Sequence, residues 1–167
     1  TYHDLGCETS RFANVLDESD ELAPAAVRRV VFCSGKVYFD LLKARRRDAI
    51  RDVALVRIEQ LYPFPTDEYA AVLRRYPAAR DVVWCQEEPQ NQGAWYQIRH
   101  RLQEKLPAGS ELLYAGRPPA AAPATGILKI HELEQAALIE AALQSEAKEG
   151  AARETTRLTA TGVRKMS

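Results

Sequence analysis

The chain has 167 residues, of which 23 are basic and 23 acidic, and 46% of them are hydrophobic. This length suits one domain with a sizeable core, and the balanced charge argues against a strongly basic nucleic-acid-binding protein or an acidic tail protein. No apolar stretch approaches the roughly 18 residues of a membrane-spanning helix, and the odd, scattered set of Cys7, Cys33 and Cys85 excludes a disulfide framework.

The first segment, residues 1–27, is polar and aperiodic and contains an acidic run at residues 17–21. Such a composition is typical of a linker, or of a segment that packs against something outside the chain. The chain also begins with Thr1 and carries no signal-like segment. We therefore expect a fragment or processed piece of a longer protein, in which residues 1–27 form the linker from a missing upstream domain.

From residue 28 onward, strand patterns alternate with helix patterns. Short apolar runs predict strands at residues 30–33, 53–58, 82–85 and 112–114. Apolar residues at the spacing of one helix face predict a helix after each strand, over residues 38–42, 69–76, 95–106 and 130–141. Two prolines make residues 61–65 a loop, and Thr66 is expected to cap the helix that follows it.

The predicted fold is an open α/β domain over residues 28–143, with a mostly parallel sheet and helices on both of its faces. The strands are apolar without alternation, which indicates that they are buried on both sides. The periodicity does not give the strand order. The tail at residues 144–167 has few large apolar residues, so we expect it to be mobile.

Polar residues and glycines gather where the predicted strands end. They fall at residues 34–36, 59–60, 87–93 and 116–126. In open α/β sheets, ligands bind outside the carboxyl ends of the strands, so this edge is the candidate functional rim. Turns between strands and helices are also rich in glycine and polar caps for structural reasons, and the pattern alone does not separate the two interpretations.

The first of these clusters, Ser34-Gly35-Lys36, suits an anion, because a glycine at a helix start lets backbone N–H groups approach it and a lysine adds charge. The phosphate-loop pattern fails, since Val30 and Val37 occupy its second glycine and its hydroxyl position. The dinucleotide fingerprint fails as well, because only one of its three glycines is present. The alternative is a tight turn with a solvated lysine.

The adjacent carboxylates Glu87 and Glu88 suggest an acid/base pair. Neighbouring residues at the end of a strand point in opposite directions, however, so these two are not expected to share a proton. We favour a structural interpretation, in which one braces the following loop and the other binds a cation or a partner's N–H group. No histidine, cysteine or serine shows the spacing of a metal site or a nucleophile, so no catalytic and no metal-binding residue is predicted.

The four rim segments resemble the C-terminal domain of 2-oxoglutarate dehydrogenases, the thiamine-diphosphate-dependent decarboxylating components of a multienzyme complex. The stretches that carry the resemblance are VVFCSGKVYFDLL (30–42), RIEQLYPFP (57–65), WCQEEPQNQGAWY (84–96) and YAGRPPAAAPATG (114–126). The second stretch is shared with other dehydrogenases that have a transketolase-type third domain, whereas the third points to the 2-oxoglutarate branch. The resemblance covers residues 12–143, and residues 1–11 and 144–167 lie outside it.

The resemblance implies that thiamine diphosphate and Mg²⁺ are bound by upstream domains of the parent enzyme, and that this fragment carries no cofactor and is inactive alone. The parent enzyme would decarboxylate 2-oxoglutarate oxidatively in the tricarboxylic acid cycle and pass the succinyl group to a lipoyl-bearing succinyltransferase. The domain would help to form a homodimer and would lie near a site for an adenylate or coenzyme A effector. Neither nucleic acid nor a membrane is expected as a partner.

Matching the family's segments residue by residue gives two sets of candidates. The candidates for effector or anion binding are Ser34, Gly35, Lys36, Arg57 and Arg117. The candidates for loop ordering or the subunit interface are Glu59, Gln60, Glu87, Glu88, Asn91, Gln92 and Trp95.

Two other functions stay open at this point. The chain could be a stand-alone regulatory or assembly module that senses adenylates or coenzyme A, or it could be the same domain of a 2-oxoadipate dehydrogenase. Its Arg-heavy, Ala-rich composition favours the bacterial cytoplasm, and the mitochondrial matrix is the alternative location.

Overall fold

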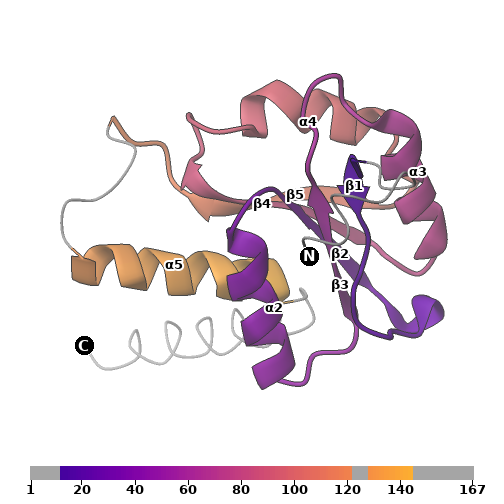
Figure 1. The fold of residues 1–167 in the computed structure, drawn as a ribbon, viewed down its shortest axis with the longest axis horizontal. Coiled ribbons are helices and arrows are strands. Elements are labelled where there is room, and N and C mark those ends of the chain that lie inside the picture. The colour runs from indigo at the N-terminus through magenta and orange to yellow at the C-terminus, as the bar shows by residue number, and fades with distance from the viewer. Residues whose placement is uncertain (1–11, 122–127, 145–167) are drawn as a thin grey trace, which may run out of the picture.

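The computed structural model describes residues 12–121 and 128–144. It contains one five-stranded sheet (Figure 1), made of β1 (Val15–Leu16), β2 (Arg29–Cys33), β3 (Val53–Ile58), β4 (Asp81–Pro89) and β5 (Glu111–Arg117). Four α-helices follow the last four strands: α2 (Val37–Arg47), α3 (Thr66–Arg75), α4 (Trp95–Glu104) and α5 (Leu128–Leu143). A short 3₁₀ helix, η1, spans Pro24–Ala26.

The strand order is β1-β3-β2-β4-β5. The four long strands are parallel, and only β1 pairs antiparallel, with the outer edge of β3. The chain leaves β2 toward β3 and later crosses back to β4 on the other side of β2. The carboxyl ends of β2 and β4 therefore form the topological switch point, where open α/β sheets bind ligands.

The helices cover both faces of the sheet (Figure 1). On one face, α3 and α4 pack through side chains such as Tyr69 and Ile98 against a core that contains Phe32 and Trp84. On the other face, α2 and α5 pack through Leu41 and Leu138, among others, against the opposite side chains of the same strands. All five residues of β2 are buried. The predicted open, mostly parallel sheet with helices on both faces is confirmed.

Several boundaries differ from the predicted ones. Strand β4 runs to Pro89, so Glu87 and Glu88 belong to the strand itself. Thr66 is the first residue of α3, and Pro65 occupies the cap position, so the predicted Thr66 cap is wrong. The Thr66 hydroxyl instead donates to the carbonyl of Phe64 at 3.4 Å.

Part of residues 12–27, the described portion of the predicted linker, packs against the sheet. Val15 and Leu16 extend it as β1, and the side chain of Val27 is fully buried. A two-residue strand is too short to show periodicity, which is why the sequence pattern resembled a linker. The remaining linker residues, the end of the fourth rim segment and the predicted mobile tail fall at 1–11, 122–127 and 145–167, outside the described residues.

Candidate functional site

The candidate site is the rim formed by the carboxyl ends of β2, β3, β4 and β5. Gly35 adopts a φ of 74°, in the left-handed region that favours glycine, and this turns the chain from β2 into α2. Lys36 follows it at the N-terminal cap of α2. The turn therefore places the lysine directly over the switch point.

Lys36 reaches across the switch point to β4. Its Nζ lies 2.7 Å from Glu87 Oε1, and this contact raises the pKa of the Lys36 ammonium group. Gln135 of α5 donates to the same Glu87 oxygen at 3.0 Å and to Asp40 of α2 at 3.1 Å. The Lys36 side chain is 77% exposed, whereas that of Glu87 is 20% exposed, so the lysine is the accessible member of the pair.

Arg57, at the end of β3, is held by stacking and by an ion pair. Its guanidinium lies 4.9 Å from the ring centre of Tyr38 and 5.4 Å from that of Phe39, both in α2. Its Nε lies 2.7 Å from Glu59 Oε1. Gln60 follows on the same rim segment and donates to the carbonyl of Pro63 at 2.9 Å.

Arg117, at the end of β5, is only 6% exposed. Its Nη2 donates to His131 Nδ1 at 2.6 Å, and its Nε lies 3.4 Å from Glu134 Oε2, both on α5. The three predicted rim cations are therefore each paired with a carboxylate. Of the three, only Lys36 has a side chain that is mostly exposed.

Gln86, which the sequence analysis did not single out, organises the loop after β4. Its Oε1 accepts hydrogen bonds from Trp84 Nε1 at 2.9 Å and from the backbone N–H of Trp95 at 3.0 Å. Its Nε2 donates to the carbonyls of Pro89 at 3.1 Å and of Gln92 at 2.8 Å. One buried amide thus ties β4 to its loop and to the start of α4. A glutamine directly after the apolar run 82–85 was the available signal.

The same loop is braced from outside by the segment after β5. Asn91 exchanges two hydrogen bonds with the backbone of Ala120, at 2.9 and 3.0 Å, and Gln92 donates to the same carbonyl at 3.1 Å. Trp95 is buried in the core, with its ring 5.1 Å from that of Tyr114. Asn91 and Gln92 therefore order the loop, and Trp95 contributes its packing to the core of this domain.

Glu88 points to the opposite face of β4 from Glu87. It lines a cleft of about 960 Å³ together with Ser34, Gly35, Gln86 and the 61–64 loop. The two adjacent carboxylates thus lie on different faces, in agreement with strand geometry, and they do not form an acid/base pair.

Among the described residues, no group of three or more His, Cys, Asp or Glu side chains is arranged to hold a metal ion. Cys33 and Cys85 are buried, and burial raises the pKa of both thiols, that of Cys85 to about 12. Such thiols are poor nucleophiles. No helix in the described part of the chain is long and apolar enough to cross a membrane.

The rim thus brings together most of the predicted candidates, but in separate contacts. Lys36 and Glu87 meet directly, as do Arg57 and Glu59. Arg117 contacts α5. Ser34 and Gly35 line the cleft. The sequence analysis missed the α5 partners Gln135, His131 and Glu134, because no pattern predicts which polar face of a helix will meet the rim.

Comparison with known proteins gives a consistent assignment. A family model described as 2-oxoglutarate dehydrogenase C-terminal matches residues 2–143. This match includes residues 2–11, which the sequence analysis had left outside the resemblance. The chain is 52% identical over 132 residues to the 2-oxoglutarate dehydrogenase E1 component of Haemophilus influenzae and 49% identical over 131 residues to that of Cupriavidus necator. It is 40% identical to a probable 2-oxoadipate dehydrogenase complex component E1 homolog of Dictyostelium discoideum.

The two bacterial matches cover 79% and 78% of this chain but only 14% of each relative. The chain therefore spans about one seventh of the length of these relatives. Among solved structures, a split-gene transketolase matches with a TM-score of 0.50 at 16% identity, covering 70% of this chain and 38% of that one. This structural likeness supports the fold alone.

Proposed function

The chain belongs to the 2-oxoglutarate dehydrogenase C-terminal family, and on that premise we propose that it serves as the third domain of a thiamine-diphosphate-dependent 2-oxoglutarate dehydrogenase. The observation that carries this proposal is the identity of 52% and 49% to two E1 components over 79% and 78% of this chain. The parent enzyme would decarboxylate 2-oxoglutarate oxidatively and pass the succinyl group to a lipoyl-bearing partner. The lower identity of 40% to the 2-oxoadipate homologue favours 2-oxoglutarate as its substrate.

Within the part of the chain that the structure describes, no residues suit the Mg²⁺ that accompanies thiamine diphosphate. The described residues hold no metal-binding group of acids, cysteines or histidines, and the sequence has no Gly-Asp-Gly motif followed by an asparagine. The proposal therefore assigns the cofactor, and with it the decarboxylation step, to other domains of the parent chain. The contribution of this domain would be structural and regulatory, in a homodimeric enzyme of the bacterial cytoplasm.

The regulatory part of the proposal concerns the rim. Lys36 would take the anionic part of an adenylate or coenzyme A effector, directly after Ser34 and Gly35 in the turn into α2. Its support is that the Lys36 side chain is 77% exposed at the switch point and that its ion pair with Glu87 is a surface contact of modest strength. Arg57 and Arg117 would contribute less to anion binding, because each is already held by an ion pair with a neighbouring glutamate.

A chimera tests the domain assignment. The matching 132-residue segment of the Haemophilus influenzae relative is replaced by the corresponding residues of this chain, and decarboxylation of 2-oxoglutarate is measured with thiamine diphosphate and Mg²⁺. We expect turnover by the chimera and none by the 167-residue chain alone. A version of the relative that lacks the segment is the matched control and should be inactive. Turnover by the isolated chain, or a folded but inactive chimera, would contradict the proposal.

A further inference from the structure

Residues 14–20, here called the strap, run along the outer edge of β3. The strap begins at the rim, where β1 pairs with Arg57 and Ile58, and it continues antiparallel to β3 toward Val53. A role of the strap in opening the rim goes beyond the proposed function, since that role depends neither on an effector nor on dehydrogenase activity.

Two kinds of contact provide hydrogen-bond partners for the backbone groups along the outer edge of β3. At the rim, the carbonyl of Asn14 accepts hydrogen bonds from the backbone N–H groups of Glu59 at 2.8 Å and Gln60 at 3.2 Å. Farther along, side chains replace the missing strand. The carboxylate of Glu18 accepts from the backbone N–H of Leu55 at 2.7 Å, and Arg45 of α2 donates to the carbonyl of Val53 at 3.0 Å. An edge that would otherwise be open to pairing is thus closed.

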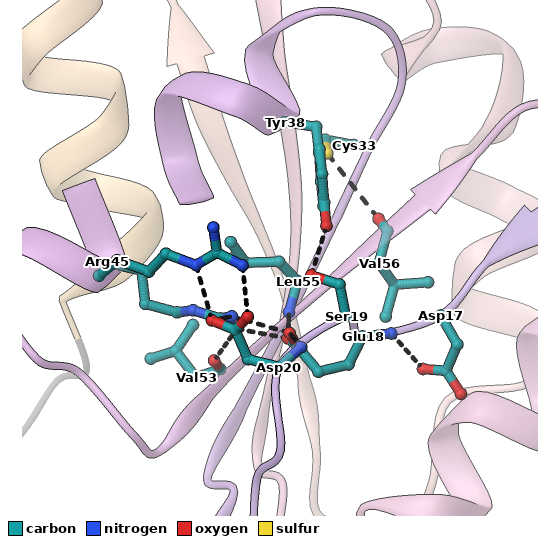
Figure 2. Close-up of polar contacts among 11 residues, drawn as sticks. Asp17, Glu18, Ser19, Asp20, Cys33, Tyr38, Arg45, Val53, Leu55 and Val56 are labelled. Atoms are coloured by element: carbon teal, nitrogen blue, oxygen red, sulfur yellow. Dashed lines mark hydrogen bonds and ion pairs between the residues drawn. The ribbon is translucent and has the colours of Figure 1, made fainter. Parts of the chain in front are cut away.

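A buried ion pair holds the strap in this position (Figure 2). Arg45 contacts both carboxylate oxygens of Glu18, and the two side chains are 1% and 2% exposed. Asp20 accepts a further hydrogen bond from Arg45 at 2.8 Å, and Ser19 bonds to the hydroxyl of Tyr38 at 3.0 Å. Removing one partner of such a pair leaves an uncompensated buried charge, which typically destabilises a protein strongly.

Apolar burial contributes less to holding the strap. Of its residues, only Val15 is packed against the hydrophobic core, and its burial is partial. The contacts of Asp17 with Arg75 and of Asn14 with Glu68 are exposed, so they add little stability. Segments with few apolar contacts open at lower free energy than the core to which they are attached.

We propose that the strap is a latch, which opens as one unit when the Glu18–Arg45 contact is broken and which then releases the β3 part of the rim. Opening would remove the β1 pairing of Arg57 and Ile58, together with the hydrogen bonds of Glu59 and Gln60 to Asn14, in a single step. The latch thus couples the ion pair at Glu18 to the backbone of the rim through Asn14 and β1.

Native-state hydrogen exchange of the 167-residue chain, followed amide by amide, tests this proposal. Leu55, Glu59 and Gln60 report on the strap, and Val31 of the central strand β2 reports on global unfolding. We expect the three strap amides to exchange together and faster than Val31. Glu18→Gln should accelerate all three by roughly the same factor, tenfold or more, because a hydrogen-bonded charge is lost, while the order of exchange, strap amides before Val31, is kept.

The matched control is Glu21→Gln, which removes an exposed carboxylate just beyond the strap and should leave all four amides unchanged. Asp20→Asn removes the charge of a carboxylate at the edge of the ion-pair cluster but keeps the Glu18–Arg45 contact. It should therefore accelerate exchange of the same three strap amides by a smaller factor. It also keeps the test decisive if Glu18→Gln fails to fold. Acceleration of Leu55 alone would mean that the strap does not move as a unit. Exchange of the strap amides at the same rate as Val31 in the wild type would mean that the strap opens only when the whole domain unfolds, and either result overturns the latch.

Discussion

Helix α2 carries a cation at each end, and each cation reaches a carboxylate on another element. At the C-terminal end, Arg45 is 1% exposed and binds Glu18, Asp20 and a strand carbonyl. At the N-terminal end, Lys36 is 77% exposed and binds the single carboxylate of Glu87. The two contacts have similar chemistry, but they differ in burial and in the number of acceptors.

This difference decides what each cation can do. A buried guanidinium whose donors are already bonded cannot take a ligand without leaving its partners unsatisfied, so Arg45 is part of the structure. An exposed ammonium group with one surface partner loses little when it exchanges that partner for another anion. Burial, more than charge, therefore makes Arg45 a structural residue and leaves Lys36 available to bind an anion.

The largest expected effect comes from Arg45→Met. This change leaves Glu18 buried without its cation, which typically costs about 3–5 kcal/mol of unfolding free energy. Urea denaturation of the variant and the wild type measures the loss. Lys43→Met, on the exposed side of the same helix, is the control and should stay within about 0.5 kcal/mol of the wild type. A loss below about 1 kcal/mol for Arg45→Met would remove the distinction between the two ends of α2.

The contrast between the two ends also shows where sequence reasoning succeeds. The four long strands, their helices and the rim followed from apolar runs and helical spacing, because these elements bury continuous apolar surface. The strap did not, since its contacts are charged side chains and a two-residue strand. An acidic run at 17–21 normally indicates a solvated segment, and only the fold brings it to Arg45.

The same reasoning explains why the sequence predicted the position of the rim residues but not their contacts. The sequence placed Lys36, Glu87 and Arg57 at strand ends, and these ends do lie on one edge of the sheet. It could not assign Glu87 to Lys36, because the strand order that makes β2 and β4 neighbours is not written in periodicity. Gln86 was not singled out within its motif, although a buried side-chain amide needs hydrogen-bond partners.

A fall in pH is expected to have an intermediate effect on the free energy of unfolding. Hydrogen bonds from Arg46 and then Arg45 lower the pKa of Asp20 from its ordinary value of 3.8 to about 2. Because the folded-state pKa lies below the unfolded one, the contribution of Asp20 is complete above about pH 4 and is lost as the pH falls through 2. Asp20→Asn should therefore show a flatter fall in unfolding free energy between pH 4 and pH 2 than the wild type. Parallel curves for the two proteins would show that Asp20 is not coupled to the arginines.

The smallest effect is expected at the other end of α2, from Lys36→Met. The ion pair with Glu87 is exposed on the lysine side, so its loss should cost less than about 1 kcal/mol of unfolding free energy. Glu87 keeps its hydrogen bond from Gln135 in the variant, and this limits the penalty for the remaining carboxylate. The difference from the wild type should shrink further in about 1 M salt, where exposed charges are screened over a few ångströms. Urea denaturation at low and high salt measures both quantities. A loss of about 2 kcal/mol or more that persists in high salt would place Lys36 with Arg45 among the structural cations, and Lys36 would then no longer be available for the anion of an effector.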